Sequence, residues 1–202
     1  MRKRDIKSTL AHHAMLGAGN SYRVNDASAI AVFLSDLQVH KRLGRVMELE
    51  RKSGCRDANY LATLPVASTF LLGEGHLATL IKQYATDALS SVQPMPSIDN
   101  IEAWSYKNTS LMAQTFVLAA TSHGLATCMM EGFDARRVRQ ILRVPDRYGI
   151  PMMVAAGYEY SGKEKNNQQR TPRLDKNEIF FGDTFGEPLD LGTNSENKSI
   201  ST

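Results

Sequence analysis

The stretch GLATCMMEGFDARRV, residues 124–138, decides the fold class because it sets a short strand between two helices. Gly124 follows a long helix-forming segment, and glycine is common just past a helix end because it adopts left-handed conformations freely. Residues 125–130 are mostly apolar and too few for a helix, which is typical of a buried strand. The stretch therefore predicts a helix, the glycine that ends it and a buried strand in direct succession.

The turn after this strand carries Glu131 and Gly132, a charged residue followed by a glycine. Two interpretations are open: a plain strand-to-helix turn, or an exposed backbone that contacts a cofactor. Asp134 stands ahead of a helix predicted over 135–143, where its carboxylate would cap the first turn for about 1 kcal/mol. The turn is thus bounded by a strand on one side and a capped helix on the other.

Strand and helix patterns alternate along the rest of the chain. Strands are expected over 29–37 and 151–158, where short runs are rich in apolar and β-branched residues. The expected helices are 39–54, ended by Gly54; 57–92, interrupted by Pro65 and by the turn at 73–76; 104–123; and 135–143, ended by Pro145.

The small number of strands and the length of the helices favour an α+β fold, in which helices cover a small mixed sheet. A regular doubly wound sheet fits this pattern less well. We expect a single domain over residues 1–188. We expect a polar, disordered tail over 189–202, which has too few apolar residues to fold.

The helix predicted over 104–123 is unusually apolar. From Leu111 to Ala120, eight of ten residues are apolar, and a helix that is apolar on nearly all sides is buried all round. Such a helix is either the central helix of the fold or a seam between subunits. A homodimer is therefore one expectation for this chain.

Composition and charge argue against several function classes. The net charge is +3, without the basic stripe and interleaved aromatic residues typical of nucleic-acid binding. No apolar run has the length of a membrane span, so we expect no membrane partner. Cys55 and Cys128 are too few for a disulfide framework, which favours a reducing compartment such as the cytoplasm. The scattered histidines show no metal-ligand spacing, and we expect no metal.

The sequence contains no nucleophile motif, no Walker loop and no G-x-G-x-x-G after a strand, so no catalytic side chain is predicted. An enzyme of this kind usually borrows the chemistry of a cofactor. Residues 103–145 resemble the signature half of the FMN-dependent nitroreductase family, with Trp104, Gly124-Leu125, Glu131-Gly132-Phe133-Asp134 and Leu142 in matching order. Three further segments are similar to the family: residues 19–33, 155–162 and 170–189.

The resemblance implies a homodimer that binds FMN at the subunit interface. NAD(P)H would reduce the flavin, and a small electron acceptor such as a nitroaromatic or a quinone would reoxidise it. The alternatives are a related flavin-dependent reduction, such as reductive dehalogenation, or a non-catalytic dimer with weak or absent flavin. Family members carry a longer segment ahead of the part matching residues 19–33, and it supplies part of their phosphate site. We therefore expect a shortened member that binds FMN weakly.

The resemblance also implies the cofactor-binding residues. Met130, Glu131 and Gly132 would lie against the flavin ring, mainly through their backbone, where a Cβ at the glycine would collide with the ring. The other implied contacts are Asn20 and Arg23 on the pyrimidine edge, and Arg170 and Arg173 on the phosphate. A guanidinium on the pyrimidine edge stabilises the negative charge of the reduced ring by about 1.5–3 kcal/mol.

Overall fold

The computed structural model of the protein describes residues 4–71, 75–159 and 172–189. Contacts within the chain divide it into two compact units, Met1–Glu159 and Tyr160–Thr202. In the second unit, α8 (Lys176–Ile179) is a single turn that begins with a capping box between Asp175 and Glu178. The domain predicted over residues 1–188 spans both units and stays a prediction. Most of the predicted tail, residues 190–202, lies outside the described residues.

A three-stranded sheet forms the centre of the first unit, in the order β1-β3-β2. The strands are β1 (Ala29–Asp36), β2 (Ala126–Met130) and β3 (Tyr148–Gly157). β3 pairs antiparallel with both neighbours, and Met153 lies opposite Val32 on one side and Met130 on the other. The expected mixed sheet is thus antiparallel in every described pair. The short connection from β2 to β3 contains one eight-residue helix, α7 (Ala135–Leu142). It brings β3 back beside β2 in the opposite direction.

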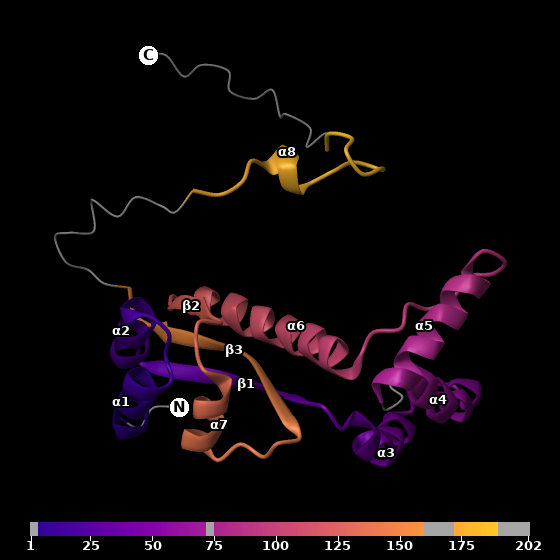
Figure 1. Ribbon diagram of the computed structural model, residues 1–202, viewed down its shortest axis with the longest axis horizontal. Helices are drawn as coiled ribbons and strands as arrows, with labels where there is room; N and C mark the ends of the chain where they lie inside the picture. Colours follow the sequence, from indigo (N-terminus) through magenta and orange to yellow (C-terminus); the bar gives the residue numbers. More distant parts are fainter. Residues whose placement is uncertain (1–3, 72–74, 160–171, 190–202) are drawn as a thin grey trace. The chain divides into compact units, whose positions relative to one another are not determined.

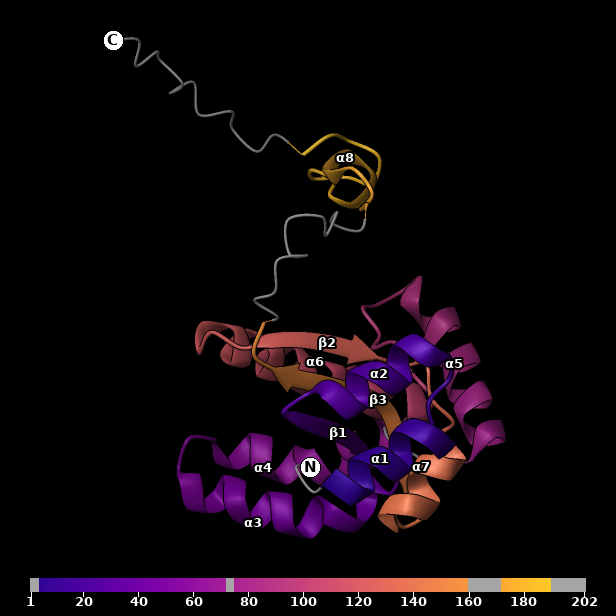
Figure 2. The same ribbon diagram turned by 90° about the vertical axis from the view of Figure 1, so that its left-hand side faces the viewer.

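Helices cover both faces of this sheet, as Figures 1 and 2 show. On one face lie α1 (Arg4–His13), α2 (Ala18–Asp26) and α7 (Ala135–Leu142). Their apolar side chains form the main core with those of the strands; its fully buried members are Leu10, Val24, Ile30, Val138 and Met153. The other face is covered by α6 (Ile101–Ser122). The α+β architecture predicted from the sequence is therefore confirmed.

The contact between α6 and the sheet includes buried hydroxyl groups. Ser35 Oγ of β1 lies 2.6 Å from Thr109 Oγ1 and donates to the Ser105 carbonyl over 3.3 Å. Ser105 Oγ in turn donates to the Asp36 carbonyl over 3.1 Å. Because buried polar groups cost free energy unless they are hydrogen-bonded, these bonds favour one alignment of α6 along β1.

The outer side of α6 is exposed within a single chain. Leu111, Met112 and Leu118 expose 65%, 64% and 62% of their surface, whereas Ala113 and Ala120 are buried. The interpretation of α6 as a central helix, buried all round, is therefore wrong. The alternative of a seam between subunits stays a prediction.

Among the described residues, a 3-10 helix and three α-helices connect β1 to α6 and project from the sheet (Figure 1). We call residues 39–90 the helical arm; it consists of the 3-10 helix η1 (Val39–Arg42), α3 (Leu43–Ser53), α4 (Ala58–Leu71) and α5 (His76–Ser90). Among the described helices none is apolar and long enough to cross a membrane alone, although α4 and α5 together, bent by 109°, meet that test.

One of the two prolines expected to limit a helix lies inside it. Pro65 was expected to interrupt its helix, yet it lies inside α4, because a proline removes one backbone hydrogen bond and bends a helix without necessarily ending it. The helix predicted over 135–143, ahead of Pro145, is α7. It ends one residue earlier, at Leu142, and Arg143 caps it in a left-handed conformation with φ of 55°.

Asp36, at the end of β1, is held by two arginines. Arg147 Nε donates to one carboxylate oxygen over 3.1 Å, and Arg42 Nε to the other over 2.6 Å. These bonds, with that of Arg147 the strongest, lower the pKa of Asp36 from 3.8 to about 2. The Asp36 side chain is 14% exposed, but those of Arg42 and Arg147 are 57% and 30% exposed, so solvent screens part of the interaction.

The free energy of unfolding should fall as the pH drops from about 4 to about 2, because the unfolded state then binds a proton that the folded carboxylate resists. The part due to Asp36 is at most about 2 kcal/mol, present above this range and lost through it. Urea titrations of Asp36→Asn should show a correspondingly shallower pH dependence than the unaltered chain. Asp146→Asn, at a fully exposed carboxylate, serves as the control. Equal slopes for all three proteins would contradict the assignment.

Candidate functional site

The turn after β2 is fixed by the segment that precedes α2. The Gly132 carbonyl accepts a hydrogen bond from the Leu16 backbone N–H over 2.9 Å. The Asp134 N–H donates to the Ala14 carbonyl over 2.7 Å. Residues 14–16 thus run beside residues 132–134 and place the start of α2 against the end of β2.

Asn20 completes this junction through all parts of its side-chain amide. Its Nδ2 donates to the Leu16 carbonyl over 3.0 Å and to the Gly132 carbonyl over 3.1 Å. Its Oδ1 accepts from Arg23 Nη1 over 3.2 Å. The two N–H groups of the amide are therefore both engaged. In this arrangement Asn20 positions Arg23 and the turn, and its predicted direct contact with a cofactor stays a prediction.

Gly132 leaves space for Asn20. A Cβ at this position would lie 2.3 Å from Asn20 Nδ2 and 3.5 Å from Asn20 Cγ. Its φ lies outside the left-handed region, so crowding, not backbone handedness, favours glycine here. The sequence analysis explained the glycine by the close approach of a flavin ring. Within the chain, the group that a Cβ would strike is the side chain of Asn20.

Several hydrogen-bond donors are available around this turn. The backbone N–H groups of Glu131 and Gly132 find no acceptor among the described residues. Glu131 and Arg23 are exposed, so the guanidinium can bind a further acceptor beside Asn20. Met130, by contrast, is 3% exposed and packs in the core. Its side chain supports the turn from inside.

A pocket of about 180 Å³ lies beside Arg23, between α2 and the strands β2 and β3. Tyr22, Thr127, Cys128 and Tyr158 contribute to its walls. Ligand pockets in proteins typically span about 300–1,000 Å³, so this pocket can take one part of a nucleotide-sized ligand but not the whole of it. The remainder of such a ligand would need further protein surface.

The structure does not place the two arginines predicted for the phosphate relative to this turn. Arg170 lies outside the described residues. Arg173 belongs to the second unit, where its Nη1 donates to the Pro172 carbonyl over 3.2 Å. Their role therefore stays a prediction. No cluster of three or more His, Cys, Asp or Glu side chains suited to a metal ion occurs in the part of the chain that the structure describes.

Comparison with known proteins finds a family match in the part of the chain that contains the Gly132 turn. The model of the nitroreductase family matches residues 97–158, which contain α6, β2, the Gly132 turn, α7 and β3. MhqN of Bacillus subtilis, whose name describes it as an NAD(P)H nitroreductase, is 25% identical over 169 residues, or 83% of this chain and 69% of MhqN. Over these residues the chain is similar to the nitroreductase family.

Solved structures of family members share the fold. A crystal structure of ydfN from Bacillus subtilis, named as a nitroreductase, gives a TM-score of 0.61 at 23% identity over 89% of this chain and 73% of that one. A nitroreductase from Exiguobacterium sibiricum, crystallised in complex with FMN, gives 0.59 at 16% identity over 89% and 72%. At these identities the likeness establishes the fold alone.

Proposed function

We propose that this chain is a member of the nitroreductase family and an FMN-dependent oxidoreductase that transfers electrons from NAD(P)H to a small acceptor such as a nitroaromatic or a quinone. The observation that carries the proposal is the Gly132 turn, where Asn20 holds Arg23 beside two unused backbone N–H groups. The name of MhqN and the FMN complex of the Exiguobacterium structure support the same cofactors.

The donors at the turn fit the polar edge of a flavin, which carries ring nitrogens and carbonyl oxygens. When bound, FMN supplies two-electron redox chemistry between a hydride donor and an acceptor. Arg23 would stabilise the negative charge that reduction places on this edge, since charge-assisted hydrogen bonds are about twice as strong as neutral ones. The N–H groups of Glu131 and Gly132 would orient the ring. Arg173 in the second unit remains the proposed phosphate contact.

Titration of the purified chain with FMN tests this proposal. We expect the flavin fluorescence to be quenched saturably, and the loaded protein to consume NADH or NADPH only when an acceptor is present. A chain that binds no FMN, and whose nucleotide consumption equals that of free flavin, would instead support the non-catalytic alternative.

Replacement of Arg23 by alanine should lower the midpoint potential of the bound flavin. The loss of one charge-assisted hydrogen bond, about 1.5–3 kcal/mol, corresponds to roughly 30–65 mV for a two-electron couple. Arg51→Ala, at an exposed arginine of α3, removes the same charge and should leave the potential unchanged. Equal potentials for Arg23→Ala and the unaltered protein, with FMN still bound, would show that Arg23 does not contact the ring.

We include a homodimer in this proposal, with the exposed side of α6 as its interface. Leu111, Met112 and Leu118 form an apolar surface there that no described residue covers. Phe116, in contrast, packs edge-on against Phe33 of β1 at 5.8 Å between ring centroids, so it stabilises the single chain as well. Sedimentation equilibrium of the unaltered chain measures this part of the proposal directly.

A further inference from the structure

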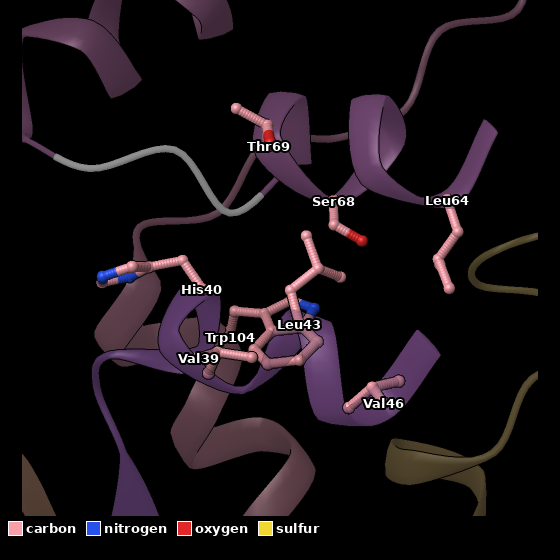
Figure 3. A pocket seen from close by; sticks show the side chains of 8 residues that line it. All are labelled: Val39, His40, Leu43, Val46, Leu64, Ser68, Thr69 and Trp104. Atoms are coloured by element: carbon pink, nitrogen blue, oxygen red, sulfur yellow. The ribbon is translucent and has the colours of Figure 1, made fainter. Parts of the chain in front are cut away.

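The helical arm contains a pocket that the Gly132 site does not use. It measures about 250 Å³ and lies between η1, α3, α4 and the first turns of α6. Figure 3 shows Leu43 and Val46 of α3, Leu64 and Ser68 of α4, and Trp104 of α6 around it. No residue of α2, β2 or the Gly132 turn lines this pocket. It is therefore separate from the proposed flavin site.

Two polar atoms of this pocket have no partner among the described residues: Ser68 Oγ and Trp104 Nε1. The neighbouring hydroxyls of α4 behave differently, because Thr63 donates to the Asn59 carbonyl over 3.1 Å and Thr69 to the Pro65 carbonyl over 2.8 Å. The Ser68 hydroxyl makes no such bond to its own helix. In Figure 3 it points away from the α4 ribbon, on the side where the Leu43 and Trp104 side chains lie. Both groups are thus placed to donate to a molecule in the pocket.

The other features of the lining restrict what this molecule can be. Among the described residues no Asp, Glu, Lys or Arg lines the pocket, and His40 is the one side chain there that can carry a charge. A cationic ligand would therefore lose its hydration without gaining an ion-pair partner from them. The indole ring offers a flat surface for stacking. An apolar cavity of about 150 Å³ is enough to hold benzene, so this larger pocket has room for one ring or two fused rings.

We propose that the helical arm binds a neutral, flat aromatic molecule that carries one oxygen acceptor. The rings would pack against Trp104 and the aliphatic side chains of α3 and α4. The oxygen would accept hydrogen bonds from Trp104 Nε1 and Ser68 Oγ. Binding at this site involves no electron transfer and does not depend on a bound flavin, so it goes beyond the proposed function.

Titration of the full chain without flavin tests the proposal, with 1-indanone as the probe and indane as the same molecule without the oxygen. Trp104 is the single tryptophan of the chain, so its emission reports binding directly, and calorimetry provides an independent measurement. We expect saturable binding of one indanone per chain. Indane should bind about threefold to thirtyfold more weakly, because it offers no acceptor to the two donors.

Three variants locate the site. Ser68→Ala should weaken indanone about twofold to tenfold and leave indane unchanged. Ser68→Leu should abolish binding of both probes, because the larger side chain fills the pocket. Thr63→Ala, on the same helix, should bind both probes as the unaltered chain does. Circular dichroism of each variant verifies that the helices are intact.

Three results would overturn the proposal. One is the absence of saturable binding to the unaltered chain. Another is unchanged affinity of a folded Ser68→Leu variant, which would place the probe elsewhere. The third is displacement of indanone by FMN, which would assign the probe to the flavin site. The first two results do not bear on whether the chain binds FMN at the Gly132 turn, so they distinguish the failure of this proposal from that of the proposed function.

Discussion

The Gly132→Ala variant should lose the junction between β2 and α2, and with it the capacity to bind FMN. The added Cβ would lie 2.3 Å from Asn20 Nδ2, well inside van der Waals contact, so Asn20 must move. Asn20 then loses its bonds to Leu16 and Gly132 and releases Arg23. We expect a loss of about 1–3 kcal/mol in the free energy of unfolding, measured by urea titration.

A double variant isolates the cause of this loss. In an Asn20→Ala background the side chain that the Cβ would strike is gone, so the further replacement Gly132→Ala should cost little. The two substitutions should therefore be strongly non-additive, as expected of residues in contact. FMN fluorescence titrations should weaken in both single variants, because Arg23 loses its support in each. If the stability losses simply add, the crowding at Gly132 has another source.

The Gly149→Ala variant should show the largest loss of stability among single-methyl additions to the sheet. Gly149 is a buried residue of β3, and a Cβ there would lie 2.4 Å from Cε1 and 2.6 Å from the hydroxyl of Tyr106. The Tyr106 ring belongs to α6, whose alignment is also fixed by Ser35 and Thr109. The added Cβ therefore displaces either the ring or the helix, and we expect a cost of about 1–3 kcal/mol.

Gly44→Ala provides the matched control for this measurement. Gly44 lies in α3, and a Cβ there would meet nothing within 4 Å. Alanine favours a helix over glycine by about 1 kcal/mol, so this variant should be neutral or more stable. Replacement of Tyr106 by alanine should in turn reduce the cost of Gly149→Ala. If Gly149→Ala unfolds at the same urea concentration as the unaltered chain, the packing of Tyr106 on β3 is wrong.

Burial of Tyr106 has a second, spectroscopic consequence. Desolvation raises the pKa of its phenol, and a hydrogen bond with Glu102 acts in the same direction. The ionisation of Tyr106 therefore lies above the ordinary range for tyrosine and shifts back toward it in any variant that opens the contact with β3. A spectrophotometric titration of Gly149→Ala thus shows whether the ring has been displaced.

Local features of the fold could be predicted because their causes are local. Gly54 and Gly124 both adopt left-handed conformations after helices, with φ of 66° and 74°. Asp134 caps α7 by accepting from the Arg137 N–H over 3.0 Å. In each case the residue and the end of the helix that it caps or terminates are at most a few positions apart. A short segment of sequence therefore includes both partners of the interaction.

The sequence predictions were wrong where a local preference competed with interactions from other parts of the chain. Pro65 lies inside α4 because the loss of one hydrogen bond does not outweigh the helix on both sides of it. The apolar composition of α6 indicated burial, but composition does not show whether the same chain supplies the cover. Strand direction, likewise, depends on how the chain returns across the sheet, and no short segment encodes that.

The sequence by itself determined the family resemblance, the α+β class and the importance of the turn at Glu131 and Gly132. Only the tertiary structure decided that Gly132 makes room for Asn20, a residue 112 positions away. The same holds for the arm pocket, whose walls come from segments on both sides of α5. Helix caps and glycine ends follow from hydrogen bonds between near neighbours, whereas a binding site depends on which distant backbone and side-chain groups the packed core brings within hydrogen-bond distance.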